Sequence, residues 1–277
     1  MLARVDLPGA ARAVPDFGAI EAQIEGHDLI AVEGGDGTVL AVTTAVMRRV
    51  EAGAPAPRLI LVPGGMTDLV ARIAGAPREA SVLTRLLTKG GRLRRLPVLR
   101  VEGAGDPLFG FFLAAGAVPR GIAYAREAIQ SQGAEGSLQV AGAVAGIAWG
   151  EKGRRKAIMA PDATRADLDG ETFGPDARFA LVTTLPGLMV GLDPFWGREK
   201  APIRVTLARG DSRHLRRRLV QLWLGMKPNR TAVDGYLSRN VHTLRLDTEA
   251  PLVLDGEDIP TGPLTVTSPR SLTVVMP

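Results

Sequence analysis

The segment Gly34-Gly35-Asp36-Gly37-Thr38 has residue types that suit phosphate binding, and it lies between an apolar run at His27–Val32 and helically spaced valines at Val39–Val50. Glycines let the backbone approach a ligand closely, and N–H groups at a helix N-terminus attract phosphate oxygens. Asp36 would repel phosphate unless a cation bridges the two, so we expect Mg²⁺ with Asp36 as a ligand. The alternative is a tight turn with Thr38 as a helix cap. The strand–loop–helix context favours phosphate binding.

A second glycine-rich segment, Pro63-Gly64-Gly65-Met66-Thr67-Asp68, directly follows the apolar run Arg58–Val62. Two such strand ends, side by side in a parallel sheet, form the crevice in which open α/β sheets bind ligands. The alternative is a turn that Thr67 caps. Together with the first segment, this one predicts a nucleotide pocket.

A third segment, Asp255-Gly256-Glu257, follows the apolar run Leu252–Leu254. Asp-Gly is common in β-hairpin turns, so a purely structural turn is one interpretation. Two carboxylates on one turn can also supply a general base together with a metal ligand or hydrogen-bond partner.

The pattern of apolar residues predicts an α/β fold. Strands at His27–Val32 and Arg58–Val62 each precede a glycine-rich loop and a helix, which favours a parallel sheet. We therefore expect a parallel-sheet nucleotide-binding domain at residues 1–92 and a mostly antiparallel, β-sandwich-like domain at residues 93–277.

Short strands dominate the predicted second domain. They include Ala157–Met159, Arg178–Thr184 and Ser271–Met276. Helices are expected at Val118–Gln132, Leu138–Ala148 and Ser212–Leu224.

Composition excludes several function classes. The 277-residue chain has no cysteine, which rules out disulfides and cysteine-based catalysis or zinc binding. The three histidines, at positions 27, 214 and 242, do not have the spacing of metal ligands. The N-terminus does not resemble a signal peptide, and the apolar runs fall short of the ~20 residues that span a bilayer. We expect a cytoplasmic protein, with peripheral contact at the inner membrane face as a further prediction.

The net charge of +5 is concentrated at Arg92–Arg95, Lys152–Lys156 and Arg213–Arg218. These can be solvated faces or can attract anionic phosphates. Arg213, Arg216 and Arg217 lie at helical spacing, so this segment is predicted to meet anionic membranes. Aromatic residues make up only 4%, so stacking sites for nucleic acid are scarce and no nucleic-acid partner is expected.

The three segments, in this order, resemble the diacylglycerol kinase catalytic-domain family, which includes bacterial lipid kinases and sphingosine kinases. GGDGT at Gly34–Thr38 is similar to the family's most specific motif. VPGGMTDLVAR at Val62–Arg72 is similar to its second loop, and DGE at Asp255–Glu257 to its C-terminal catalytic turn. The resemblance implies a nucleotide domain, a β-rich lipid domain and an active site between them.

The resemblance also implies roles for individual residues. Gly34, Gly35, Asp36, Gly37 and Thr38 would hold ATP. Gly65, Met66 and Thr67 would line the same pocket. Asp255 would take the proton of the acceptor hydroxyl, and Glu257 would support it. The implied activity is ATP- and Mg²⁺-dependent phosphorylation of a diacylglycerol-like lipid.

Two alternatives remain open. Met66 and Asp68 stand where the family usually has Thr and Asn, and the Asn-Pro loop that usually precedes GGDGT is missing. These departures favour a catalytically weak or non-catalytic nucleotide- or lipid-binding relative. A kinase of a soluble hydroxyl acceptor is the other alternative, which a polar cleft would favour over an apolar one.

Overall fold

The computed structural model describes residues 16–64, 68–76, 80–103, 105–130, 152–188, 193–215, 217–218, 221 and 232–277. The predicted helix at Leu138–Ala148 and three predicted site residues, Gly65, Met66 and Thr67, lie outside these ranges.

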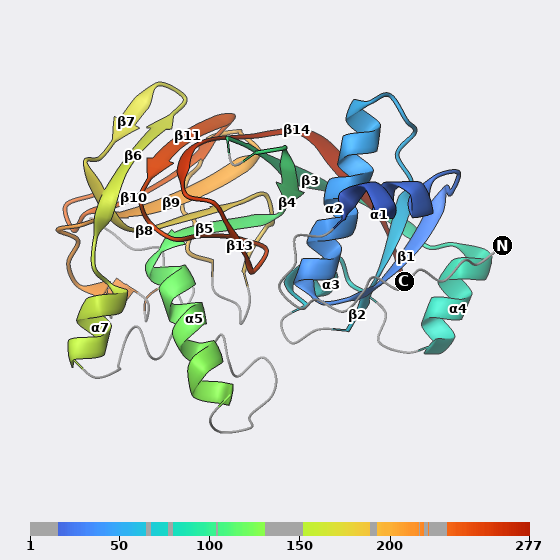
Figure 1. Cartoon of the computed structure of the whole chain (residues 1–277), viewed down its shortest axis with the longest axis horizontal. Helices are drawn as coiled ribbons and strands as arrows, with labels where there is room; N and C mark the ends of the chain where they lie inside the picture. Colours follow the sequence, from blue (N-terminus) through green and yellow to red (C-terminus); the bar gives the residue numbers. More distant parts are fainter. Residues whose placement is uncertain are drawn as a thin grey trace.

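The chain forms two lobes, one rich in helices and one rich in strands (Figure 1). The first lobe contains α1 (Phe17–Ile24), β1 (Leu29–Gly34), α2 (Asp36–Glu51), β2 (Arg58–Pro63), α3 (Leu69–Ile73) and α4 (Ala80–Lys89). β1 and β2 pair in parallel, with Gly34 opposite Pro63. The predicted strand–loop–helix order around both glycine-rich segments is confirmed.

Strands connect the lobes and build the second one. Their bounds are β3 (Arg92–Glu102), β4 (Leu108–Gly110), β5 (Phe112–Gly116), β6 (Asp162–Leu168), β7 (Glu171–Phe173), β8 (Asp176–Thr183), β9 (Ile203–Arg209), β10 (Tyr236–Val241), β11 (Thr243–Thr248), β12 (Leu252–Leu254), β13 (Glu257–Ile259) and β14 (Gly262–Met276). Two helices, α5 (Ala117–Gln130) and α7 (Lys152–Ile158), complete the described secondary structure.

The long strand β14 belongs to both lobes. Its residues Thr273 and Val274 pair in parallel with β2, whereas Gly262–Thr267 pair antiparallel with β11. β3 runs antiparallel beside β14 along most of its length. The α/β class with an antiparallel second lobe is confirmed. The division at residues 92 and 93 stays a prediction, because β14 returns to the first sheet.

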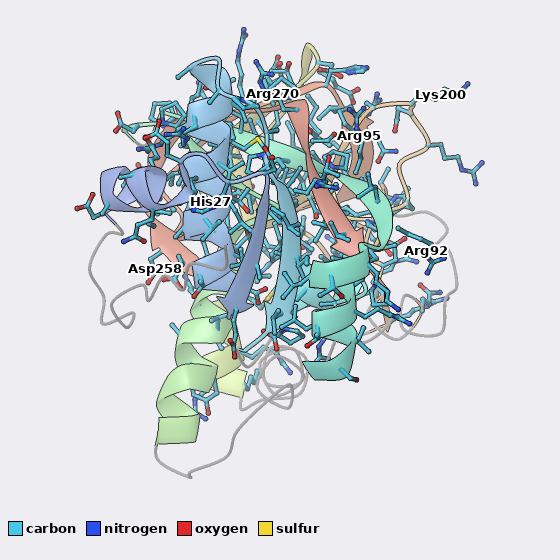
Figure 2. All side chains as sticks on the ribbon, turned by 90° about the vertical axis from the view of Figure 1, so that its right-hand side faces the viewer. His27, Arg92, Arg95, Lys200, Asp258 and Arg270 are labelled. Carbon is cyan, nitrogen blue, oxygen red and sulfur yellow. The ribbon has the colours of Figure 1, made fainter. Side chains whose placement is uncertain are left out.

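Charged side chains project from β3, β14 and the loop before β9 (Figure 2). Arg95 on β3, Lys200 in the loop and Arg270 on β14 are all exposed. We call these three residues the β3 surface.

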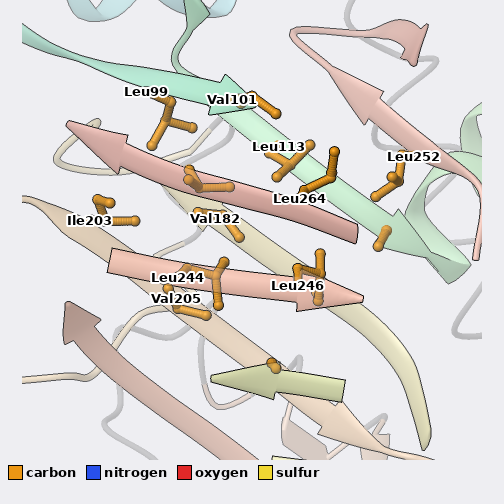
Figure 3. Packing of buried hydrophobic residues seen from close by; sticks show 14 of the residues in the cluster. Leu99, Val101, Leu113, Val182, Ile203, Val205, Leu244, Leu246, Leu252 and Leu264 are labelled. Atoms are coloured by element: carbon orange, nitrogen blue, oxygen red, sulfur yellow. The ribbon is translucent and has the colours of Figure 1, made fainter. Parts of the chain in front are cut away.

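The two lobes have separate hydrophobic cores. In the first lobe, Val39 and Val46 of α2 pack with Leu59 of β2 and Leu272 of β14. In the second, two layers of strands face each other (Figure 3). Leu264 of β14 and Leu246 of β11 lie in one layer, and Val182 of β8 and Val205 of β9 lie in the other. The alternation of inward and outward side chains along each strand makes this packing possible.

One predicted strand, Ala157–Met159, is wrong. Its first two residues end the helix α7, and Ile158 and Met159 pack against Ala117 at the start of α5. Three apolar residues are too few to distinguish a strand from the buried end of an amphipathic helix.

Candidate active site

The first glycine-rich segment joins β1 to α2. Gly35 is the N-cap of α2, and no side chain caps this helix end. A Cβ at Gly34 would lie 2.6 Å from Oγ1 of Thr38, so glycine is required for this packing. The backbone N–H groups at the start of α2 therefore have no capping side chain. A helix N-terminus that binds phosphate uses these N–H groups.

The second glycine-rich segment touches the first. The Gly64 N–H donates to the carbonyl of Gly34 at 3.2 Å. A Cβ at Gly64 would lie 3.0 Å from the Gly34 nitrogen and Cα. The two strand ends therefore meet closely, as predicted from the parallel sheet.

Asp36 turns from the start of α2 towards α3. Its Oδ1 accepts a long hydrogen bond of 3.5 Å from the Val70 N–H. Burial raises the pKa of Asp36 to about 6, and the charge of Asp68 acts in the same direction. Asp68 is itself buried, at a left-handed φ of 48°. Asp36 and Asp68 therefore form a pair of carboxylates beyond the ends of β1 and β2.

The Asp255-Gly256 pair is the turn between β12 and β13, so the hairpin interpretation is correct. Both residues have positive φ, 48° for Asp255 and 88° for Gly256, as a tight hairpin turn requires. This result leaves the catalytic interpretation open, because the same turn carries two carboxylates.

Asp255 is held against the junction of β4 and β5. Its carboxylate accepts hydrogen bonds from the N–H groups of Phe111, at 3.0 Å, and Phe112, at 2.8 Å. Its own N–H donates to the Phe112 carbonyl at 2.8 Å. Burial raises the pKa of Asp255 to about 8, although both amide hydrogen bonds act to lower it. The side chain is therefore fixed in position before any ligand binds.

The two motifs from opposite ends of the sequence meet between the lobes. A Cβ at Gly37 would run into the carboxylate of Glu257, so Glu257 lies against the glycine-rich segment. The charge of Asp36 contributes to raising the pKa of Asp255. The structure thus brings together Gly34, Gly35, Asp36, Gly37, Thr38, Asp255 and Glu257 in one region.

Sequence reasoning missed the role of Gly110. A Cβ there would lie 2.6 Å from Oδ2 of Asp255 and 2.9 Å from Leu254 side-chain atoms. Glycine between Phe109 and Phe111 allows β12 and its turn to approach. An isolated glycine inside an apolar strand run is the signal that could have revealed this contact.

The predicted magnesium ligand, Asp36, has a neighbouring carboxylate, that of Asp68. Among the described residues, no three His, Cys, Asp or Glu side chains form a complete metal cluster. Asp36 and Asp68 nevertheless repel each other in a partly buried place, and a divalent cation would relieve that repulsion. Asp36 remains the predicted ligand.

The raised pKa values of Asp36 and Asp255 predict that the protein without ligand becomes less stable as pH rises. Folded Asp255, with a pKa of about 8, keeps a proton that the unfolded chain loses near pH 3.8. One such proton lowers the free energy of unfolding by up to about 1.4 kcal/mol per pH unit between these values. Asp36 acts in the same direction up to about pH 6.

Asp255→Asn is therefore expected to flatten the decline of melting temperature between pH 5 and pH 8. Thermal melts without ligand measure this. If the variant and the original protein decline in parallel, Asp255 ionises normally in the fold.

Residues 6–101 match the family model of the diacylglycerol kinase catalytic domain. The resemblance to the diacylglycerol kinase family is confirmed. The match covers both glycine-rich segments, Gly34–Thr38 and Pro63–Asp68, and marks this part of the chain as a kinase-family domain. No curated protein sequence matches the chain.

Two solved structures confirm the fold over nearly the whole chain. A diacylglycerol kinase from Bacillus anthracis is 16% identical, with a TM-score of 0.62 over 94% of this chain and 80% of that one. A protein from the same organism, proposed to be a diacylglycerol kinase, is 15% identical, with a TM-score of 0.67 over 94% and 81%. An NAD kinase from Archaeoglobus fulgidus in complex with ATP gives a TM-score of 0.48 at 15% identity, over 91% and 79%.

No helix in the described part of the chain is long and apolar enough to cross a membrane.

Proposed function

We propose that this protein is an ATP- and Mg²⁺-dependent kinase that phosphorylates a hydroxyl of a diacylglycerol-like lipid. The observation that carries the proposal is the meeting of Glu257 with Gly37, which brings the carboxylate turn of one lobe to the glycine-rich segment of the other. Phosphoryl transfer needs positioned groups and neutralised charge more than covalent chemistry by the protein.

The first lobe would hold the nucleotide. Backbone N–H groups at the start of α2 face the phosphates in this proposal, and Gly34 and Gly64 keep side chains out of the way. Asp36 would hold Mg²⁺, which supplies positive charge to the phosphates when bound. The predicted contributions of Gly65, Met66 and Thr67 to this pocket remain part of the proposal.

The second lobe would act on the acceptor. In its ionised form, Asp255 would receive the proton of the lipid hydroxyl, because two backbone hydrogen bonds fix it in position. Burial raises its pKa to about 8, so this proposal predicts that the activity increases as pH rises towards 8. Glu257, exposed beside Gly37, would orient the hydroxyl between the base and the nucleotide.

An apolar cluster beside Asp255 favours a lipid acceptor over a soluble one. Ala114 and Val253 are buried at its centre, and the half-buried side chains of Phe112, Val118, Ile122 and Leu188 pack against it. Phe112 also donates its N–H to Asp255, so this surface adjoins the proposed base. Contact of acyl chains with such a surface removes apolar area from water and so favours binding of the lipid.

Replacing Ile122 with Ser is expected to raise the KM for the lipid by roughly tenfold, as loss of one apolar contact of about 1–2 kcal/mol implies. The KM for ATP should not change. Initial-rate assays in mixed micelles measure both constants.

Leu237→Ser is the matched control, since Leu237 is also half-buried but lies on β10 against the second core. Equal changes in both variants, or a change in the KM for ATP, would show that the apolar cluster does not select the acceptor.

The second candidate function is that of a non-catalytic nucleotide- or lipid-binding protein, and Asp68 is the residue that favours it. This residue places a second carboxylate beside Asp36, where the resemblance leads us to expect a neutral Asn. ATP binding without transfer to any hydroxyl would favour this candidate. Transfer to a soluble acceptor in preference to a lipid would instead favour the soluble-acceptor kinase.

A further inference from the structure

A basic surface gathers around α7 in the second lobe. Leu215 also packs against the apolar cluster of Ala117, Ile158 and Met159, so the segment around Leu215 lies next to α7. The cations around this cluster are Lys152, Arg154, Arg155, Lys156, Arg213 and Arg217. We call these six residues the α7 surface.

The α7 surface concentrates positive charge on α7 and the neighbouring segment around Leu215. Lys152, Arg155 and Lys156 are three and four residues apart, so they share one side of the helix. Within the described residues, none of the six cations has an ion pair with a carboxylate.

The neighbouring acids are already paired with other arginines. Asp162, just after α7, pairs with Arg120. Asp234 pairs with Arg218, which is buried with 8% of its surface exposed. Arg218 therefore has a structural role, in contrast to the membrane role predicted for the whole segment Arg213–Arg218. Arg216 lies outside the described residues.

An aromatic ring accompanies these cations. The Arg154 guanidinium lies 4.6 Å from the centre of the Tyr124 ring, and its Nη1 donates to the Tyr124 hydroxyl at 2.6 Å. Tyrosine, with an apolar ring and a polar end, suits the headgroup region of a bilayer.

The helices α5 and α7 lie on the lower side of the molecule in Figure 1. The end of β2 and the start of α3 also lie on the lower side of the molecule, in the other lobe (Figure 1). The β3 surface, by contrast, lies beside the upper part of β14 and along an edge of the molecule (Figure 2).

We propose that the α7 surface docks on the anionic headgroups of a lipid bilayer and turns the active site towards the lipid. This inference rests on the proposed function for the choice of a membrane as the partner. The six cations complement the negative surface of such a bilayer, and each contributes to affinity near an anionic surface. Nucleic acid is the less suitable partner, because aromatic residues that could stack on bases are scarce.

The test compares two triple variants with the same change in charge. The first, Lys152→Glu/Lys156→Glu/Arg213→Glu, alters exposed residues of the α7 surface. The second, Arg95→Glu/Lys200→Glu/Arg270→Glu, alters the β3 surface. Both are assayed by co-sedimentation with phosphatidylcholine vesicles, with and without phosphatidylglycerol, at low and high salt.

The first variant is expected to bind phosphatidylglycerol vesicles about a hundredfold more weakly, at roughly fivefold per cation, whereas the second keeps most of its affinity. High salt should weaken binding of the original protein. Equal losses in the two variants, or equal binding to neutral and anionic vesicles, would overturn the proposal. So would a first variant that loses binding to an RNA probe but not to vesicles.

Two further measurements separate this proposal from the proposed function. Melting temperature and ATP binding of the first variant should match those of the original protein, which shows that the fold and nucleotide site are intact. If the original protein binds anionic vesicles through the α7 surface but phosphorylates no lipid, the docking surface stands and the kinase activity fails. If it phosphorylates a dispersed short-chain lipid but does not bind vesicles, the kinase activity is supported and the docking surface is refuted.

Discussion

Asp255→Asn is expected to lower the turnover number for lipid phosphorylation by about 10²–10⁴-fold, the usual effect of losing a general base. ATP affinity should stay unchanged, because Asp255 belongs to the β12–β13 turn and not to the glycine-rich segment. Asn has nearly the same shape and keeps one acceptor oxygen for the Phe112 N–H, but its NH₂ group replaces an oxygen that accepts from the Phe111 N–H, and it cannot take a proton. Turnover in mixed micelles and ATP binding by calorimetry measure the two effects.

Asp258→Asn is the matched control for this prediction. Asp258 lies three residues further along, on β13, and its side chain is exposed (Figure 2). This variant should keep normal turnover. Glu257→Gln tests the supporting role separately. If Asp255→Asn keeps near-normal turnover while Glu257→Gln loses it, Glu257 is the base and Asp255 only fixes the turn.

Asp36→Asn is expected to weaken ATP binding in the presence of Mg²⁺ by at least about 10–100-fold, the range for groups that only support the ligands of a metal. Binding without Mg²⁺ should weaken little or even improve, because a carboxylate without a cation repels the phosphates. Calorimetric titration with ATP, with and without Mg²⁺, measures the difference.

Asp28→Asn is the control for the nucleotide site. Asp28 is exposed and lies just before β1, at the end of the strand opposite Gly34. Loss of affinity in this variant, or an equal loss with and without Mg²⁺ in Asp36→Asn, would contradict a metal role for Asp36.

The first lobe could be predicted well from the sequence because its signals are local. The apolar run before Gly34 and the helical spacing of Val39, Val42 and Val46 fixed the order of strand, loop and helix. Each signal involves residues within one or two turns of each other, where periodicity is informative. The helix α1 was missed, since its eight residues have only Ile20 and Ile24 buried.

The long-range features could not be predicted from local patterns. Glu257 lies beside Gly37, although the two residues are more than two hundred positions apart in the chain. The periodicity of apolar residues does not predict this contact. The resemblance to the kinase family predicted that meeting. The amide hydrogen bonds to Asp255 and the passage of β14 through both lobes depend on tertiary packing and had no sequence signal that we identified.

The most direct test of the proposed activity is transfer of the labelled γ-phosphoryl group of ATP to diacylglycerol in mixed micelles, with a soluble polyol as the competing acceptor. We predict labelled phospholipid that requires Mg²⁺ and greatly exceeds labelled polyol. Absence of labelled product from either acceptor, in a protein that calorimetry shows to bind ATP, would contradict the kinase account and leave a non-catalytic nucleotide-binding protein.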